Sequence, residues 1–185
     1  MSLKKETMPA ESGKAEKRKG VKNPACMLAI ALLICLISAW GSSLVKSGGG
    51  SITVKQLQWE TPSGHMQDAQ LFIPRTATEK TPAPAVVVVH GWGDSKEVQE
   101  PHYVELSRRG YVVLDIDMYG HGDSDSVPIN TWWDEGTGAN GVYDGVQLLA
   151  TLPYVDASQI GIEGHSNGAY SCNMAVLLDN EADKP

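Results

Sequence analysis

The run Ala85-Val86-Val87-Val88-Val89 constrains the fold more than any other segment. It is apolar, rich in β-branched residues and free of polar alternation, which is typical of a strand covered on both faces. The sequence that follows alternates between helix and strand patterns, with a helix expected over 97–109, a strand over 111–116, a helix over 134–152 and a short strand over 160–163. We therefore expect an α/β domain with a doubly wound, mostly parallel sheet.

Two further strands are expected before this run. Residues 52–60 and 67–73 read as strands joined across Thr61-Pro62-Ser63-Gly64, whose proline and glycine favour a turn, so a hairpin is predicted. The Gly/Ser-rich residues 46–51 are expected to form a flexible linker. The folded domain is therefore predicted to occupy 52–185.

An uncharged apolar segment over 25–45 precedes the linker. A spanning helix needs about 20 apolar residues and a cleavable signal about 7 to 15, so the length favours a transmembrane anchor. Basic residues outnumber acidic ones over 1–24, which predicts a cytoplasmic tail and an extracytoplasmic domain at the cell membrane. A cleaved signal remains the alternative, because Ala39 and Gly41 have the small-residue spacing of a cleavage site, and the domain would then be secreted.

Charge and cysteine usage exclude several classes. The net charge is −7, and the basic tail makes the remainder more acidic still, which argues against nucleic-acid binding. Cys26 and Cys35 lie within the apolar segment, so Cys172 is left alone and is expected in the core rather than in a disulfide. No Cys/His spacing builds a zinc site, and we expect neither a metal nor a cofactor.

The residues Gly164-His165-Ser166-Asn167-Gly168 match the pattern G-x-S-x-G. A strand is predicted before them and a helix from about Asn167, which is the context of a nucleophile elbow. The turn is so sharp that side chains two residues before and after the serine would collide with strand and helix, so glycine is needed there. Ser166 is therefore the predicted nucleophile, and a purely structural glycine turn is the alternative.

The predicted strand 85–89 ends in His90-Gly91-Trp92-Gly93-Asp94. Acyl transfer places negative charge on a carbonyl oxygen, and backbone N–H groups can stabilise it. The expected oxyanion donors are the N–H groups of Trp92 and Asn167. For His90 alone, a satisfied loop histidine is the favoured interpretation.

Three segments, HGWGD, YVVLDIDMYGHGDSD and VDASQIGIEGHSNGA, together resemble the α/β-hydrolase superfamily, especially its dienelactone-hydrolase-like and serine-peptidase-like members. The resemblance implies the central sheet, the elbow at Ser166 and the two oxyanion donors. It also implies that residues 117–125 form a surface loop that shapes the surroundings of the site without supplying the catalytic acid.

The sequence departs from this family after the nucleophile. The family order is Ser, then Asp or Glu, then His, yet no histidine follows Ser166. We therefore expect an incomplete domain whose triad acid and histidine lie beyond Pro185, so that these residues alone have little activity. A rearranged triad that uses His121 or His165 is the alternative.

The expected function is two-step acyl transfer on carboxylic esters by a membrane-anchored serine hydrolase. Peptide or aminoacyl bonds are the alternative substrates within the same fold. A catalytically dead, membrane-anchored binding module is the alternative from another class. Trp92, Trp132 and Trp133 are expected either to line an apolar site or to pack in the core. The sequence does not define the oligomeric state.

Overall fold

The chain divides into two compact units, Met1–Ala39 and Trp40–Pro185. The computed structural model describes residues 23–128, 139 and 141–182. Helix α1 (Pro24–Lys46) contains the apolar segment, and none of its residues is buried. Its length of 23 residues and the mean hydropathy of 2.3 over 18 of them fit a membrane-spanning helix, and a signal sequence near the N-terminus meets the same criteria. The helix therefore fits either expected role, anchor or signal.

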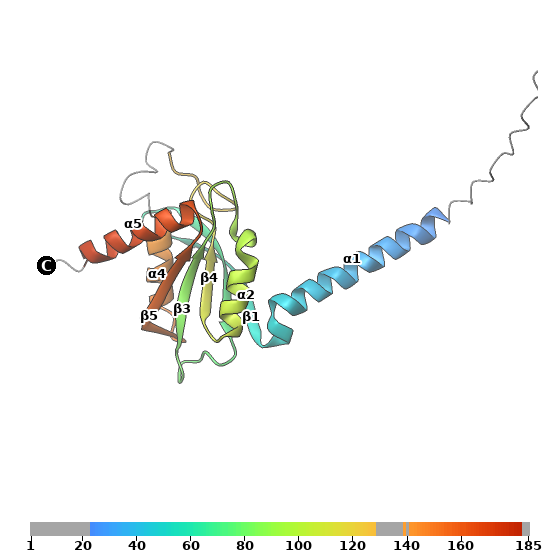
Figure 1. Ribbon diagram of the computed structural model, residues 1–185, viewed down its shortest axis with the longest axis horizontal. Coiled ribbons are helices and arrows are strands. Elements are labelled where there is room, and N and C mark those ends of the chain that lie inside the picture. The colour runs from blue at the N-terminus through green and yellow to red at the C-terminus, as the bar shows by residue number, and fades with distance from the viewer. Residues whose placement is uncertain (1–22, 129–138, 140, 183–185) are drawn as a thin grey trace, which may run out of the picture. The chain divides into compact units, whose positions relative to one another are not determined.

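Within the described residues, five strands form one sheet in the order β1-β2-β4-β3-β5. Figure 1 shows β3 between β4 and β5. Strand β3, which contains the apolar run, pairs in parallel with both β4 and β5. Strands β1 and β2 form the predicted hairpin, and β2 also pairs antiparallel with β4. The sheet is therefore mixed, with three parallel strands as expected and an antiparallel hairpin beside them. The strands are β1 (Ile52–Glu60), β2 (Met66–Pro74), β3 (Ala83–Val89), β4 (Val112–Ile116) and β5 (Val155–Gly164).

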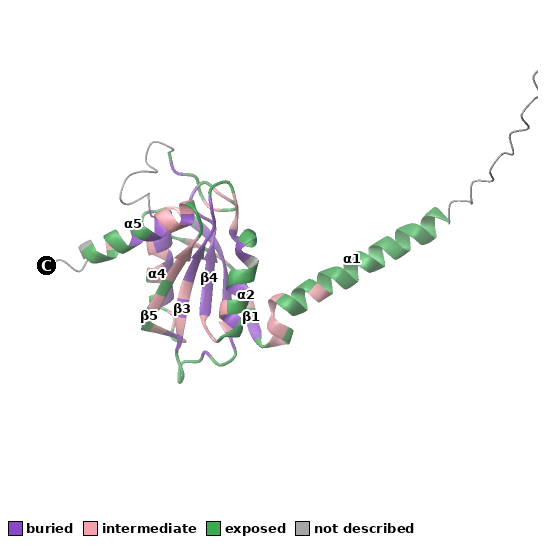
Figure 2. Ribbon diagram, in the orientation of Figure 1, coloured by how far each residue is buried: buried purple, intermediate pink, exposed green. Residues whose placement is uncertain are grey.

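Helices cover both faces of the sheet, and the two faces explain the apolar run in β3. Val88 packs on one face, in a cluster with Tyr103 of helix α2 (Glu100–Arg108). Val87 and Val89 point to the other face, toward the helices α4 (Val142–Ala150) and α5 (Asn167–Ala182). Because both faces are covered, Val87, Val88 and Val89 are buried in succession, and Val86 is half-buried. Figure 2 shows the neighbouring central strand β4 as buried.

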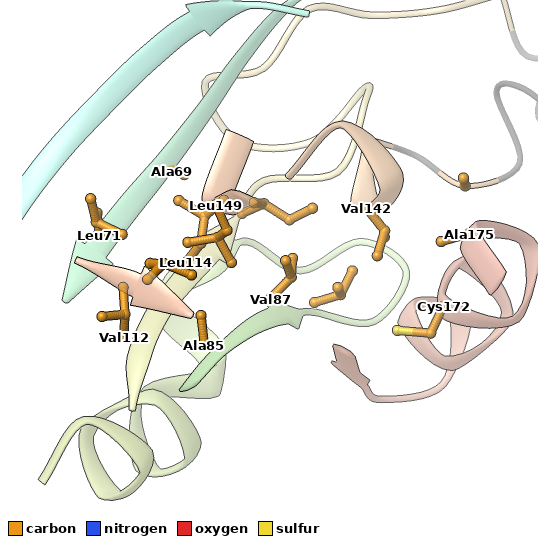
Figure 3. Packing of buried hydrophobic residues seen from close by; sticks show 14 of the residues in the cluster. Ala69, Leu71, Ala85, Val87, Val112, Leu114, Val142, Leu149, Cys172 and Ala175 are labelled. Atoms are coloured by element: carbon orange, nitrogen blue, oxygen red, sulfur yellow. The ribbon is translucent and has the colours of Figure 1, made fainter. Parts of the chain in front are cut away.

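The larger core cluster lies between the sheet and the helices α4 and α5 (Figure 3). It contains Leu114 from β4, Leu149 from α4 and Ala175 from α5. Cys172 belongs to the same cluster, as expected, and burial raises the pKa of its thiol to about 11. The thiol is therefore neutral at physiological pH and packs as a small apolar group.

The helices differ from the expected ranges at their starts. The segment expected as a helix from 97 begins instead with a 3₁₀ turn, η2 (Lys96–Gln99), followed by α2. Of the helix expected over 134–152, α4 occupies Val142–Ala150, and residues 139 and 141 lie in turns rather than in the expected helix. Gly141, the residue before α4, has a φ of 81°, which lies outside the α-helical range, so it cannot be part of the helix. Residues 129–138 and 140, which include Trp132 and Trp133, lie outside the described residues.

The carboxyl ends of β3, β4 and β5 lie at one edge of the sheet, because the three strands are parallel and adjacent. Loops therefore leave this edge at His90, Asp117 and His165. The turn between β1 and β2 reaches the same edge, since the N–H of Asp117 donates to the carbonyl of Asp68 at the start of β2. In parallel α/β sheets this is the edge where ligands bind.

Asp115 is a buried carboxyl group in the middle of β4, opposite Gln70 of β2. Both of its carboxyl oxygens lack a hydrogen-bond partner within the described residues. Burial, reinforced by the negative charge of Asp117, raises the pKa of Asp115 well above its ordinary value of 3.8. The folded state therefore holds a proton that the unfolded state releases, and stability falls as the pH rises above 3.8 toward the folded-state pKa.

Replacing Asp115 with asparagine removes this proton from the folding equilibrium. Between the unfolded-state and folded-state pKa values, each pH unit costs the wild type about 1.4 kcal/mol of stability, and asparagine does not carry this cost. We therefore expect the free energy of unfolding of Asp115→Asn, relative to the wild type, to be at least about 1.4 kcal/mol higher at pH 7 than at pH 4. This difference in the free energy of unfolding should shrink as the pH falls toward 3.8, because more of the Asp115 carboxyl is then protonated in the unfolded state as well. Urea unfolding from pH 4 to pH 8 measures this difference, and parallel pH profiles would contradict the assignment.

Candidate active site

Ser166 occupies a strained turn between β5 and α5. Its φ is 53°, and it is the one non-glycine residue with a positive φ among the described residues. The turn is closed by two hydrogen bonds, from the N–H of Gly168 to the carbonyl of His165 (2.8 Å) and from the N–H of Ala169 to the carbonyl of Ser166 (3.1 Å). Ser166 itself is exposed. The left-handed conformation costs an L-residue roughly 1–2 kcal/mol, and such strain is concentrated at functional sites.

The glycines on either side of Ser166 are required by close backbone contacts. A Cβ atom on Gly164 would lie 2.4 Å from the carbonyl carbon of Gly168. A Cβ atom on Gly168 would lie 2.5 Å from the carbonyl oxygen of His90 and 2.6 Å from that of Val89. The first turn of α5 therefore packs directly on the end of β3, which brings the two predicted motifs together.

The loop after β3 lies beside Ser166. A Cβ atom on Gly91 would be 3.5 Å from the Cβ of Ser166 and 3.5 Å from the Cδ2 of His165. The next residue, Trp92, has a side chain that is 54% exposed. Asn167 is the first residue of α5, so its N–H has no partner within the helix. The two segments that carry the expected oxyanion donors are therefore neighbours of the serine.

His90 is fully buried and holds this loop in place. Its Nε2 accepts a hydrogen bond from the N–H of Met118 (3.0 Å), and its Nδ1 lies 2.7 Å from the carbonyl oxygen of Gly91. Burial lowers the pKa of His90, so the ring is neutral, with Nδ1 donating and Nε2 accepting. This is the geometry of a satisfied loop histidine, as the sequence favoured for His90 alone.

His121 also connects the loops after β3 and β4. Its Nε2 accepts from the N–H of Gly93 (3.1 Å), and its Nδ1 lies 3.1 Å from the carbonyl oxygen of Tyr119. Its ring stands edge-on to the rings of His90 and Trp92, at centroid distances of 5.1 and 5.9 Å. Both ring nitrogens of His121 thus contact backbone atoms, which gives a rearranged triad no support from this residue.

The other histidines have different surroundings. His65 packs edge-on against Tyr119, with ring centroids 5.2 Å apart, and His102 pairs with Glu163. His165 is exposed and lies in the elbow turn. Within the described residues, none of the five histidines is hydrogen-bonded to the Ser166 hydroxyl. The catalytic base that the chemistry needs is therefore not seen in this part of the chain.

A buried lysine that the sequence did not single out lies at the same edge. Lys96 is 2% exposed, and its Nζ lies 2.6 Å from Oδ2 of Asp117 and 2.9 Å from Oδ1 of Asp68. The carboxylates of Glu97 and Asp123 are more distant, at 3.5 and 3.6 Å. Burial alone would lower the pKa of Lys96, but its hydrogen bonds to Asp117 and Asp68 outweigh burial and raise the pKa above the ordinary value. Lys96 therefore carries a buried positive charge.

The three carboxylates around Lys96 have the spacing of a possible metal site. One oxygen from each of Asp68, Asp117 and Asp123 lies within 4.8 Å of the others. The ammonium group of Lys96 contacts all three, so it already supplies the positive charge that a metal ion would bring. The segment 117–125 was expected to be a surface loop, but its first residue, Asp117, is 0% exposed.

The strain at Ser166 predicts that a glycine there stabilises the fold. Glycine adopts a φ of 53° without steric cost, although it loses more backbone entropy on folding, about 0.5–1 kcal/mol. Ser166→Gly is therefore expected to be more stable than Ser166→Ala by about 1 kcal/mol. Thermal unfolding of the two variants measures the difference, and equal stability would show that the turn relaxes in solution.

The fold and the elbow together define the class of protein. The sheet carries a strand-turn-helix unit with a strained serine, and this fold is that of the α/β-hydrolases. More narrowly, residues 98–182 match the prolyl oligopeptidase family. Among curated protein sequences, none gives a significant match.

Several solved structures share the fold. DcsB, solved with a substrate analogue, is 26% identical with a TM-score of 0.57, and the match covers 69% of this chain and 42% of that chain. An acetyl xylan esterase from a Paenibacillus species is 19% identical with a TM-score of 0.58, covering 70% of this chain and 46% of that one. An esterase from Pyrococcus furiosus is 21% identical with a TM-score of 0.54, covering 68% and 47%. The chain therefore spans less than half the length of each of these structures.

Proposed function

We propose that the protein is a serine hydrolase that cleaves carboxylic esters through an acyl-enzyme, with Ser166 as the nucleophile. The observation that carries this proposal is the left-handed conformation of Ser166, which presents its side chain at the carboxyl edge of the sheet beside Gly91. Strain at a single exposed serine, enforced by two obligatory glycines, has no evident structural purpose. It is what a nucleophile elbow requires.

The proposed reaction proceeds in two steps. The Oγ of Ser166 attacks the ester carbonyl, and the N–H groups of Trp92 and Asn167 donate to the oxygen that becomes negative. A general base takes the serine proton and passes it to the leaving alcohol, and in the triad mechanism this base is a histidine that a carboxylate orients. All five histidines of this sequence lie within the described residues, and none of them is hydrogen-bonded to Ser166. Water then attacks the acyl-enzyme by the same route and releases the acid.

Two features bear on the substrate. Two of the solved structures with this fold are named as esterases, which favours ester substrates. The match of residues 98–182 to the prolyl oligopeptidase family favours peptide or aminoacyl bonds as the second candidate. A catalytically dead binding module is the candidate from another class, since no described histidine contacts Ser166. We place ester substrates before peptide substrates because two of the solved structures that share the fold are named as esterases.

Helix α1 supports a location at the membrane. Its 23 residues, most of them apolar, suit a single span, and we propose that it anchors the hydrolase domain on the extracytoplasmic side with the basic tail in the cytoplasm. Release after signal cleavage is the alternative. Protease treatment of intact cells tests the proposal, because an anchored outward domain would be cleaved from the cell surface while the tail stays protected.

A substrate panel tests the proposed function. The protein, isolated from the cells that produce it, is assayed with p-nitrophenyl acetate and butyrate and, in parallel, with aminoacyl p-nitroanilides. Ester hydrolysis that exceeds anilide hydrolysis in kcat/KM supports the esterase. The reverse order supports the peptidase, and no turnover of either class supports the binding module.

A further inference from the structure

The acyl-transfer mechanism makes no use of Lys96, although this residue is buried at the same edge of the sheet as Ser166. Burying an ammonium group and its carboxylate partners removes their hydration, and a buried ion pair is therefore weak evidence for a stabilising role by itself. The role of the buried positive charge of Lys96 therefore has to be inferred from the contacts of its side chain and backbone.

Asp117 accepts two hydrogen bonds from Lys96. Its Oδ1 accepts the backbone N–H of Lys96 (2.8 Å), and its Oδ2 accepts from the Nζ of the same residue (2.6 Å). The Oδ2 atom also accepts the N–H of Asp123 (3.0 Å). Gly122 makes room for this arrangement, because a Cβ atom there would lie 2.0 Å from Asp117 Oδ2. Lys96 is thus fixed through both its backbone and its side chain.

These contacts close a loop that carries Trp92. His90 at its start contacts the N–H of Met118, and Gly93 in its middle donates to His121. Lys96 at its end is held by Asp117. The three partners, Met118, His121 and Asp117, all lie within residues 117–121. The loop 90–96 is therefore hydrogen-bonded to this one segment at its start, middle and end. In the sequence, Trp92 lies between His90 and Gly93, which make the first two of these hydrogen bonds.

We propose that Lys96 is a positioning residue, which fixes the loop that carries the Trp92 amide beside Ser166 through its bonds to Asp117 and Asp68. The proposal rests on the proposed function, because it concerns the oxyanion donor of that reaction. A donor stabilises the developing charge only when it is already in place before the reaction. Lys96 touches no reacting atom, so it acts through the loop alone.

The test compares Lys96→Met with Lys96→Arg, and uses Lys55→Met as the matched control because Lys55 is exposed on β1. The protein is isolated from the cells that produce it, and active sites are counted with an organophosphonate titrant. Loss of one oxyanion donor lowers kcat by about 10²- to 10³-fold, so Lys96→Met should lower kcat about 100-fold. KM should stay within about threefold, because the donor acts in the transition state.

Hydrogen exchange of residues 90–96 provides a readout that does not depend on activity. In Lys96→Met these amides should exchange at least about tenfold faster, while those of β3 keep their protection. Lys96→Arg keeps the positive charge, so its kcat should be at least about tenfold higher than that of Lys96→Met. The kcat and the hydrogen exchange of Lys55→Met should match those of the wild type. If Lys96→Met does not accumulate as folded protein, Asp68→Asn takes its place, with an expected loss of about tenfold in kcat and faster exchange in the loop.

Two results would overturn the proposal. One is a Lys96→Met protein of lower stability whose kcat per titrated site equals that of the wild type, which would show a merely structural role. The other is unchanged exchange of the loop in whichever variant is tested. Failure of the proposed function gives a separate result, because the wild type would then bind no titrant and Ser166→Ala would lose no activity.

Discussion

Ser166→Ala is expected to lower ester hydrolysis by roughly 10⁴- to 10⁶-fold, the range in which removal of a triad nucleophile falls. The fold should survive, because Ser166 is exposed and alanine keeps the same backbone preferences. The loss should appear in kcat with little change in KM, since the hydroxyl forms a bond only in the reaction itself. Steady-state kinetics with p-nitrophenyl acetate measures both constants.

Ser158→Ala is the matched control for this loss. Ser158 lies on β5, the strand that leads into the elbow, and its exposed hydroxyl donates to Asp156 at 2.7 Å. Its replacement should leave hydrolysis within about twofold of the wild type and cost little stability. A loss of less than tenfold in Ser166→Ala would mean that another group attacks the substrate.

Gly168→Ala is expected to destabilise the fold by about 3 kcal/mol or more. The added carbon would lie 2.5 Å from the carbonyl oxygen of His90 and 2.6 Å from that of Val89. Both are backbone atoms, so no side-chain rotation relieves the contact. Either α5 or the end of β3 has to move, and the site loses its geometry with it.

Gly161→Ala isolates the effect of the close contact. Gly161 also lies on β5, and the nearest atoms to an added Cβ would be 3.9 Å away, an ordinary van der Waals distance. The free energy of unfolding of this variant should be within about 1 kcal/mol of that of the wild type, because alanine lowers the conformational entropy of the unfolded chain without straining the strand. Urea unfolding of both variants gives the comparison. Equal stabilities would show that the first turn of α5 does not pack on β3 as described.

Local patterns were enough to predict the centre of the fold. The uninterrupted apolar run predicted a strand covered on both faces, and its register against β4 and β5 explains why both faces are covered. The hairpin strand Ile52–Glu60 begins and ends where its sequence indicated, since a proline-glycine turn marks its end. The strand-turn-helix unit around Ser166 follows in part from neighbouring residues, because Gly164 is required by a close contact with Gly168 in the same turn. Gly168 is required by the end of β3, which is a long-range contact.

Long-range contacts account for what the sequence did not reveal. Lys96 has the composition of a solvent-exposed loop residue, and its burial depends on Asp68 and Asp117, which lie on other strands or loops. Strand β5 begins at Val155 rather than near Ile160, because its first residue pairs with Ala83. The polar residues 156–159 gave no sign of this pairing. In both cases the deciding partner is more than twenty residues away in the chain.

The role of Ser166 is tested most directly by mapping a covalent adduct. The protein, isolated from the cells that produce it, is treated with a fluorophosphonate, digested and analysed by mass spectrometry. We predict one adduct, on the peptide that contains Ser166, and its loss after brief prior exposure to an ester substrate that forms a slowly hydrolysed acyl-enzyme. An adduct on a different residue, or active hydrolysis by a protein that takes up no fluorophosphonate, would contradict the assignment of Ser166 as the nucleophile.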